Sequence, residues 1–573
     1  MNAGEPRPGG GSEGTVEGVP GGPAAPGAPP APRRFHEARW EEPVIFELSV
    51  PGARGVLPPR PDRDVPELAE DERVPAAVRR HRPPALPELA QQAVVRHYLR
   101  LSQETLGADL NVDVGQGTCT MKYSPKIHDQ LARSPRLAEL HPLQDERTVQ
   151  GILEVMYRLD LQLREISGMD AFTLQPASGS QAIFAAAAML RAWHRSRGQY
   201  PARDEIITTI FSHPSDAAAA HVAGFRILTL QPGPRGHPDV GALRAVLGER
   251  TAGLFITNPE DTGIFNPDIA EFTRLVHEAG GLCVYDQANA NGLLGITRAR
   301  EAGFDACFFN LHKTFSTPHG SGGPACGALG VRSVLEPLLP APVVTFDGER
   351  YHLDADRPQS VGKVRTWYGV PEVHLRAYAW IASLGADGLR TVAESAVLCN
   401  NYLLERVRRI RGVAVPWPDR RRLEQVRYSF EPLRRETGIG SEDVGRRMAD
   451  FGAHYWTSHH PWLVPEPFTL EPTESYSQQE LDEYAAALER VSREAYEDPE
   501  LVRTAPHASV VHRHDHGPLD DPSRWAVTWR AYLRKGRGPG SGDTGDAPPG
   551  DADTGDADPG NADPDRSSRA PGP

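Results

Sequence analysis

Long apolar runs are absent from this sequence, and no stretch of about 18 apolar residues is available to span a bilayer as a helix. The chain opens with Gly, Pro and Glu residues, whereas a secretory signal begins with a basic stretch followed by an apolar one. These two absences predict a cytoplasmic protein.

An excess of positive charge is absent as well. The chain has 62 Lys and Arg against 76 Asp and Glu, which gives a formal net charge of -14. Nucleic-acid binding requires a concentrated basic surface that neutralises phosphates, so this class of partner is excluded. The short basic run Arg420–Arg422 is expected to be a solvated surface.

Cysteine is scarce and shows no metal-binding pattern. The five cysteines are odd in number and scattered, with no CxxC spacing, so the sequence predicts neither a disulfide framework nor a zinc site. We expect them to be reduced and mostly buried, and no metal is predicted.

The two ends of the chain differ in composition from the rest. Residues 1–35 are dominated by Gly, Pro and Ala, and residues 536–573 repeat Gly-Asp-Ala-Asp-like units. Neither segment can bury enough apolar surface to offset the entropy of ordering, so both are predicted to be disordered tails. Between them, the composition is that of an ordinary globular protein with a large core.

From about residue 170 to 332, short β-branched or aromatic runs alternate with helical patterns, which is typical of βαβ units. The predicted strands are Ile206–Phe211, Arg226–Leu230, Gly253–Thr257, Leu282–Asp286 and Cys307–Leu311. The predicted helices are Ser180–Arg197, Val240–Gly248 and Ile269–Ala279. We therefore predict a large α/β domain with a mainly parallel sheet over residues 151–385.

The pattern changes from about residue 386. A long amphipathic helix over Gly388–Ile410 and a final helix near Ser477–Tyr496 flank shorter segments, which predicts a small α+β domain over residues 386–535. Residues 36–150 form a lead-in segment with an apolar helix at Glu88–Leu101, and we expect this segment to pack against a partner subunit.

Lys313 is the first candidate for chemistry. It follows a continuous apolar strand and precedes the Gly-rich loop Pro318–Pro324. Burying an ammonium at the mouth of a sheet is costly unless the group is functional or paired. A salt bridge at the strand end is the structural alternative, but the glycines favour close approach of the backbone to a ligand.

Asp286 ends another apolar strand. The ligand crevice of an α/β sheet lies beyond the carboxyl ends of its strands, so Asp286 and Lys313 should both face it. An Asp there can hydrogen-bond a protonated pyridine nitrogen and keep the ring an electron sink, which points to pyridoxal 5'-phosphate (PLP). The alternative is that Asp286 caps a following helix.

Ser178, Gly179 and Ser180 lead into an Ala-rich helix, whose N-terminal N–H groups could cradle a phosphate, although the turn is also a good helix cap. His213 follows a strand and could stack on the pyridine ring. Each of these short motifs is weak evidence by itself. A PLP site is supported by their order along the chain, which is phosphate loop, His213, Asp286 and Lys313. His312, next to Lys313, completes the predicted cofactor-binding set.

At this point the residues resemble a known family, the lysine-bearing subunit 2 of the glycine cleavage system P-protein, an aminomethyl-transferring, decarboxylating glycine dehydrogenase. The resemblance extends from about residue 95 to 515. It is carried by Asn310–Phe315 with Pro318–Gly320 and Gly322–Pro324, Cys119–Tyr123 with Pro125–Lys126, Thr257–Pro259 with Gly263, Arg357–Pro358, Ser360, Gly362, Tyr368–Gly369, Arg376–Tyr378 and Glu471–Glu474.

The resemblance implies a fold type I, PLP-dependent transferase-like domain with PLP on Lys313, and Lys313, His213 and Asp286 as catalytic residues. It implies glycine decarboxylation with aminomethyl transfer to the lipoyl group of H-protein. It also implies a homologous subunit 1 as partner, in a heterodimer or heterotetramer. Group II decarboxylases share the His-Lys pair but usually follow it with an aromatic residue, where this chain has Thr314.

Several positions depart from the family pattern. Val114–Thr118 replace a Tyr-Pro-Leu-Gly-Ser stretch, and Ala177, Ser180, Ala182 and Ile183 differ around the phosphate loop. After His213, the residues Pro214, Ser215 and Asp216 replace Gly-Thr-Asn. Asp216 near a substrate carboxylate would be unfavourable unless the ligand had changed or the acid were protonated.

These departures keep two alternatives open: a PLP enzyme acting on another small amino acid in specialised metabolism, and a non-catalytic partner subunit. Arg365 and Arg376 are candidates for binding the substrate carboxylate.

Overall fold

A computed structural model provides the structure. It describes residues 35–57, 75–80, 84–106, 112, 114–115, 122–141, 143–319, 325–365, 368–454, 463–510, 513, 517 and 521–534, and the statements below concern these residues. Both predicted tails, apart from residue 35, lie outside the described residues, as do Cys119–Met121 and Gly320–Pro324 of the family motifs.

The large domain is built on a seven-stranded sheet with the order β1-β7-β6-β5-β4-β2-β3. Strand β7 runs antiparallel to both of its neighbours, and the remaining pairs are parallel. This confirms the prediction of a mainly parallel α/β sheet. The strands are β1 (Ala171–Thr173), β2 (Glu205–Thr209), β3 (Arg226–Leu230), β4 (Thr251–Thr257), β5 (Leu282–Gln287), β6 (Ala306–Asn310) and β7 (Gly327–Val331).

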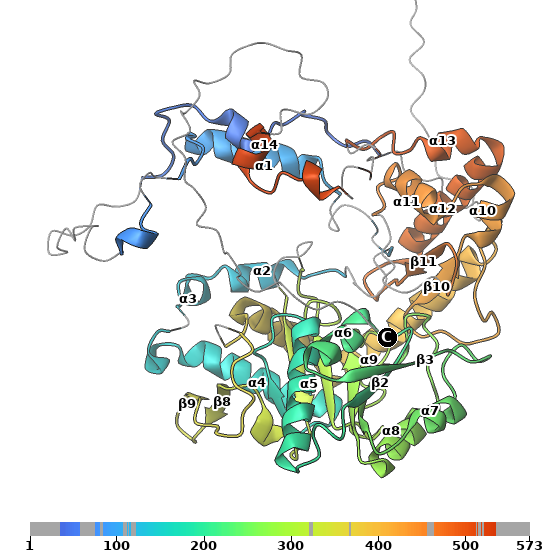
Figure 1. Ribbon diagram of the computed structural model, residues 1–573. Helices are drawn as coiled ribbons and strands as arrows, with labels where there is room; N and C mark the ends of the chain where they lie inside the picture. The colour runs from blue at the N-terminus through green and yellow to red at the C-terminus, as the bar shows by residue number, and fades with distance from the viewer. Residues whose placement is uncertain are drawn as a thin grey trace, which may run out of the picture.

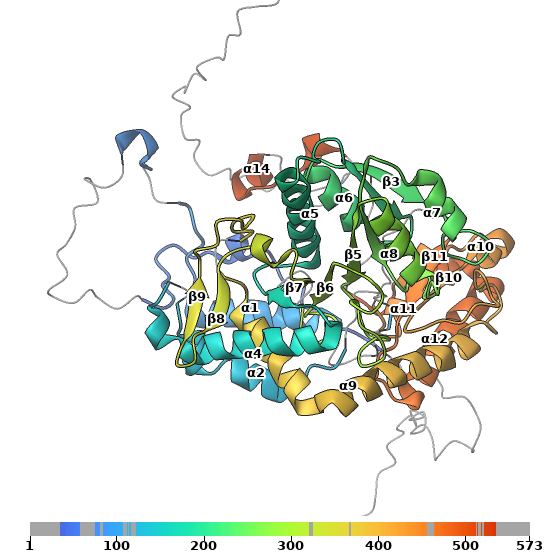
Figure 2. The same ribbon diagram turned by 90° about the horizontal axis from the view of Figure 1, so that it is seen from below.

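Helices cover both faces of this sheet (Figure 2). On β5, Cys283 and Tyr285 belong to one core and Leu282 and Val284 to the other, because successive side chains of a strand point to opposite faces. The first core also takes side chains from α4 (Gln150–Ser167), α7 (Val240–Val246), α8 (Ile269–Glu278) and α9 (Pro371–Val407). The second takes side chains from α5 (Gly179–Ser196) and α6 (Pro214–Val222).

Helix α9 leads from the sheet domain into a third, separate core (Figure 1). The predicted helix Gly388–Ile410 covers only its second part, because the helix begins at Pro371 and is interrupted at Gly385, where φ is 64°. The third core is formed with the antiparallel pair β10 (Val426–Ser429) and β11 (Pro467–Leu470) and with α10 (Glu431–Thr437), α11 (Ser441–Ala449), α12 (Gln478–Glu497) and α13 (Pro499–Arg503).

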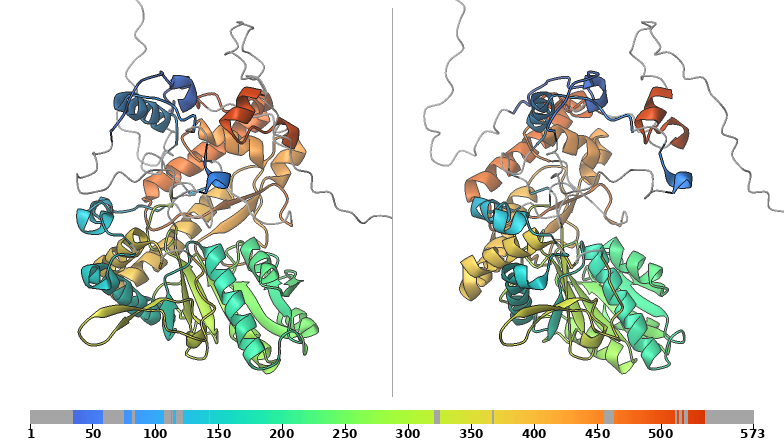
Figure 3. Two further views of the ribbon diagram at one scale, coloured as in Figure 1. Left: turned by 60° about the vertical axis from the view of Figure 1, so that its left-hand side comes forward. Right: turned by 90° about the vertical axis from the view of Figure 1, so that its left-hand side faces the viewer.

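The lead-in segment carries α1 (Gln91–Gln103), α2 (Lys126–Ala132) and α3 (Pro135–Ala138). Figure 3 shows α1 at the same end of the molecule as the C-terminal helices, with the large sheet at the other end. The remaining elements are the hairpin β8 (Val343–Phe346) and β9 (Tyr351–Asp354), the short helix α14 (Trp529–Arg534), and the single-turn helices η1 (Ile45–Leu48), η3 (Ala76–Val78), η4 (Glu146–Thr148), η5 (Glu336–Leu338) and η7 (Pro522–Arg524).

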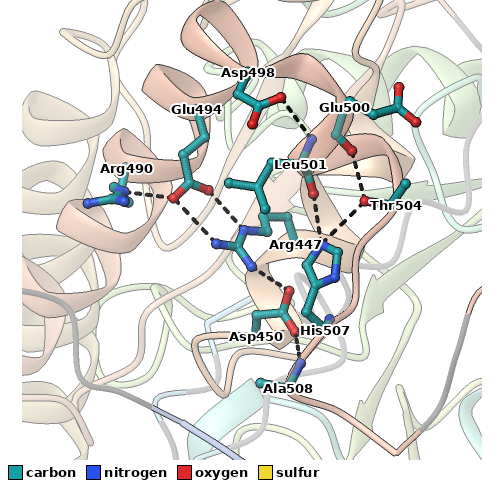
Figure 4. A network of polar contacts seen from close by, with 10 residues as sticks. All are labelled: Arg447, Asp450, Arg490, Glu494, Asp498, Glu500, Leu501, Thr504, His507 and Ala508. Atoms are coloured by element: carbon teal, nitrogen blue, oxygen red, sulfur yellow. Dashed lines mark hydrogen bonds and ion pairs between the residues drawn. The ribbon is translucent and has the colours of Figure 1, made fainter.

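A network of paired charges holds the C-terminal helices together (Figure 4). Arg447 on α11 contacts Glu494 on α12 at 2.9 Å and Asp450 at 2.7 Å. The other oxygen of Asp450 accepts hydrogen bonds from the backbone N–H groups of His507 and Ala508. The network therefore fixes the segment after α13 as well as the helices.

Three sequence predictions can be compared directly with these features. The prediction that Arg420–Arg422 is a solvated surface is wrong for Arg422, which is buried and donates hydrogen bonds to the carbonyls of Pro416 and Arg420. The four described cysteines are free, and three of them are buried, which agrees with the expectation. Among the described residues, no helix is both long and apolar enough to cross a membrane.

Candidate active site

The predicted site residues come from four elements that meet at the carboxyl edge of the large sheet. His213 follows β2, Asp286 lies at the end of β5 and Lys313 follows β6. Ser178–Ser180 form the start of α5. Parallel strands end at the same edge, so residues distant in sequence are brought to one place by the topology.

Lys313 lies in a tight turn after β6, where its backbone N–H bonds the carbonyl of Asn310 at 3.0 Å. The residue is only 7% exposed. Its ammonium makes no ion pair or hydrogen bond within the described part of the chain, so the salt-bridge alternative is not observed there. The charge that faces it is Asp286, whose carboxylate it stabilises.

Asp286 is buried and held by two hydrogen bonds. The Thr257 hydroxyl donates to its Oδ2 at 3.2 Å, and the Ala288 N–H donates to its Oδ1 at 2.8 Å. Residues 288–305 are all described and contain no helix, so the alternative that Asp286 caps a following helix is not observed. Burial raises the pKa of Asp286, and the Ala288 N–H, Lys313 and the Thr257 hydroxyl oppose that shift.

The start of α5 packs closely against the Lys313 segment. A Cβ at Gly179 would lie 2.5 Å from the Asn310 side chain, so only glycine allows this approach. Ser178 caps α5 by accepting a hydrogen bond from the Gln181 N–H at 3.1 Å, while Ser180 is exposed. The capping alternative therefore holds for Ser178, and, as in any α-helix, the N–H groups of the first turn have no carbonyl partner within the helix.

Two histidines flank the site. His213 is the N-cap of α6, and its Nδ1 accepts the Ser215 N–H at 3.1 Å, which in the neutral ring leaves the proton on Nε2. His312 is buried, and its Nδ1 accepts the Cys326 N–H at 3.2 Å. Burial and the neighbouring Lys313 lower the pKa of His312 to about 3, so this imidazole is neutral.

Two further acids are buried here. Asp216, in the first turn of α6, is fully buried, and burial together with the neighbouring Asp286 charge raises its pKa well above the usual range. Glu260, in the loop after β4, is also buried, and burial raises its pKa to about 8. The sequence marked Asp216 as a departure from the family pattern, and it gave no signal for Glu260.

The sequence also gave no role to Lys122, Glu471 and Glu474, although all three lie in family motifs. The Lys122 ammonium donates to the Thr314 carbonyl at 2.8 Å, pairs with Glu474 at 2.9 Å and lies 4.7 Å above the Trp380 ring. Glu471 accepts hydrogen bonds from the amides of Asn289 and Asn291 in the loop after Asp286. The lead-in segment and the C-terminal region thus fix the two loops that carry Asp286 and Lys313.

Of the two predicted carboxylate ligands, Arg376 is already engaged by Asp129 on α2. Arg365 lies near Cys326 and His374, where burial raises the pKa of Cys326 to about 12 against the effect of Arg365 and lowers the pKa of His374 to about 4 together with it. The structure therefore leaves Arg365 as the more available of the two.

The arrangement suits PLP. The chain has only five lysines, and one of them, Lys122, is committed to Glu474. Lys313 offers an amine for an aldehyde, Asp286 offers a carboxylate for a ring nitrogen, and the first turn of α5 offers N–H groups for a phosphate.

Comparisons with known proteins agree with this geometry. Residues 177–341 match the aminotransferase class-V family, which places the sheet domain among PLP-dependent enzymes, and residues 392–513 match the glycine dehydrogenase C-terminal domain. The solved structure of an inhibitor-bound glycine decarboxylase (P-protein) of the glycine cleavage system has a TM-score of 0.60 at 20% identity, covering 75% of this chain and 93% of that one. A cysteine desulfurase from Thermococcus onnurineus shares the fold, with a TM-score of 0.53 at 15% identity over 67% of this chain and 95% of its own.

Two relatives match over almost their whole length. A probable glycine dehydrogenase (decarboxylating) subunit 2 from Pyrococcus abyssi is 44% identical, covering 87% of this chain and 98% of the relative. The protein of the same name from Aeropyrum pernix is 41% identical, covering 88% and 99%. With this identity across nearly all of both chains, the protein belongs to the glycine dehydrogenase (decarboxylating) subunit 2 family.

Proposed function

We propose that this chain is the PLP-bearing subunit of a glycine-decarboxylating enzyme and that Lys313 holds the cofactor. The observation that carries the proposal is that Lys313 and Asp286 are buried at the same edge of the sheet, where the charge of Lys313 acts on Asp286. A buried amine without a partner among the described residues faces a buried carboxylate at the ligand-binding edge of the sheet. PLP, when bound, supplies an electron sink for the bond that breaks at the substrate α-carbon.

The neighbouring residues bind and orient the cofactor in this proposal. The N–H groups of Gly179 and Ser180, with the Ser178 hydroxyl, hold the phosphate at the start of α5. His213, fixed by Ser215, presents its ring to the pyridine face. His312 is neutral and adds no second positive charge beside Lys313. Asp286 holds the proton of the pyridine nitrogen.

The proposed substrate is glycine, as the names of the relatives indicate. Its carboxyl group leaves as CO2, and the remaining aminomethyl carbon forms a bond to one sulfur of an oxidised lipoyl group on H-protein. The lipoyl S–S bond breaks and its second sulfur is reduced to a thiol, so the carbon is oxidised as the disulfide is reduced. The enzyme itself needs no further oxidant.

The proposed partner is a homologous subunit 1, since the relatives are named as one subunit of two. Exposed apolar side chains support this partner. On α1, Val95, Tyr98 and Leu99 are about half exposed, and on α2 Ile127 is 55% exposed. Apolar side chains gathered on two helices of the lead-in segment are typical of a surface that a partner covers.

The test is a spectrum of the purified protein with PLP, alone and with glycine, followed by release of labelled CO2 with lipoylated H-protein and a matching subunit 1. Glycine-dependent CO2 release is the expected result. Alanine and serine serve as matched substrates. CO2 release from either of them, with none from glycine, would mean that the substrate is another small amino acid. A protein that binds no PLP would overturn the proposal.

A further inference from the structure

Asp216 is a buried acid to which the proposed function gives no role. It is fully buried, and neither of its oxygens receives a hydrogen bond from a donor among the described residues. The charged group that acts on it is the carboxyl of Asp286. Two buried carboxylates in contact are strongly unfavourable when both are charged, so the pair needs a proton between them.

The hydrogen bonds around the pair indicate which acid keeps that proton. Asp286 accepts from the Thr257 hydroxyl and the Ala288 N–H, and Lys313 stabilises its charge. Asp216 has none of these contacts, and burial together with the Asp286 charge raises its pKa well above the usual range. Donors favour the ionised form, so Asp286 is the carboxylate and Asp216 is the acid.

Few other charges act on the pair. Helix α6 packs against α5, β2, β3 and β4, and β4 carries no ionisable side chain. The ionisable residues of the other three elements lie toward the opposite edge of the sheet; they are Arg191, His194, Arg195, Glu205 and Arg226. On α6 itself, His213 caps the first turn and His221 lies in the last one. Lys313 is the charge from another element that acts on Asp286.

We propose that Asp216 is a positioning residue that remains protonated at neutral pH and donates a hydrogen bond to the Asp286 carboxylate, so that the two acids carry a single negative charge. The role of this pair rests on the proposed function, because Asp286 then binds the pyridine nitrogen. A neutral acid donates one hydrogen bond, as an amide would, and adds no charge. Unlike an amide, it releases its proton to solvent base at high pH, and the charge opposite the ring nitrogen then doubles.

Infrared spectroscopy of the full-length protein, as purified at pH 7, tests this directly. A protonated carboxyl has a C=O stretching band that a carboxylate lacks. Protein labelled with ¹³C-aspartate should shift this band if an aspartic acid carries the proton. Asp216→Asn should remove the label-sensitive band. Glu260→Gln is the matched control: it should remove a separate, label-insensitive band, because Glu260 is a second buried acid that holds a proton.

The absence of a label-sensitive band in the wild-type protein, or its survival in Asp216→Asn, would overturn the proposal. If Asp216→Asn does not fold, Asp286→Asn decides, because it changes the acceptor of the Asp216 proton and must move the band; an unmoved band contradicts the pairing. These spectra require neither glycine nor turnover. Loss of glycine decarboxylation with the band present would therefore remove only the proposed function, and normal turnover without the band would remove only this inference.

Discussion

Around Arg447 in the C-terminal region, buried charges are paired, whereas at the carboxyl edge of the large sheet the buried acids exceed their donors. Burial raises the pKa of Glu494, but hydrogen bonds from Arg447 and Arg490 outweigh it and leave that pKa below its usual value. At the sheet edge, burial raises the pKa of Glu260 to about 8. Burial and Glu471 raise the pKa of Glu424 to about 8 as well.

The difference separates two uses of buried charge. A paired cluster offsets the cost of desolvation and fixes the packing of its helices. Buried acids without such partners stay protonated, and the cost of burying them is offset less. Groups of this kind gather where a protein performs chemistry. We infer that the Arg447 cluster contributes stability, and that the acids around Asp286 are retained for their effect on the site.

The largest effect, on the free energy of unfolding, is expected from a substitution that breaks the paired cluster around Arg447. Arg447→Met leaves Glu494 and Asp450 buried without their shared partner, and removal of one member of a buried ion pair costs about 3–5 kcal/mol. The measurement is denaturant unfolding. Arg490→Met is the control, because Arg490 pairs with the same Glu494 from a half-exposed position and should cost less than about 1 kcal/mol. Equal losses in the two variants would contradict the distinction.

The next effect concerns the sheet edge. Asp286→Asn keeps the shape of the side chain but removes the charge that holds a pyridinium proton, so PLP should remain bound while turnover falls on the order of 100-fold. Single-turnover CO2 release and cofactor retention after gel filtration measure the two properties separately. Unchanged turnover would mean that Asp286 only stabilises the loop through Ala288.

The smallest effect appears as a pH dependence of stability. Glu260 has a folded pKa of about 8 against an ordinary value of 4.5, so its stabilisation is complete below the unfolded pKa and is lost as pH rises toward 8. Between pH 5 and pH 7, Glu260→Gln should gain about 2 kcal/mol relative to the wild type. Unfolding curves across this range check the trend, with exposed Glu497→Gln as the control. A pH-independent difference would show that Glu260 is ionised in the native state.

Much of the fold could be predicted because its central strands are continuous apolar runs. The predicted strand Leu282–Asp286 is observed as the central, buried strand β5 with one residue more, and the edge strand Arg226–Leu230 is observed with the predicted bounds. Strand β1 has only three residues and β7 contains two glycines, so neither carries a recognisable pattern, and each is a strand only because it pairs with its neighbours. The start of α9 was missed because Gly385 divides its apolar periodicity.

Lys313 and Asp286 could be predicted as neighbours because each lies at the carboxyl end of an apolar strand. The contacts that fix their loops could not be predicted, because they join distant segments: Lys122 reaches Thr314 across 192 residues, and Glu471 reaches Asn289 across 182. Only the folded chain shows that Asp216 meets Asp286.

The most direct test of the account is to load the protein with PLP, reduce it with borohydride and map the modified lysine by peptide mass spectrometry. Five lysines compete for the label: Lys122, Lys126, Lys313, Lys363 and Lys535. We predict that the label lies on Lys313 in the wild type and that Lys313→Ala traps none. A label on another lysine, or one that persists in Lys313→Ala, would contradict the assignment of this edge of the sheet as the active site.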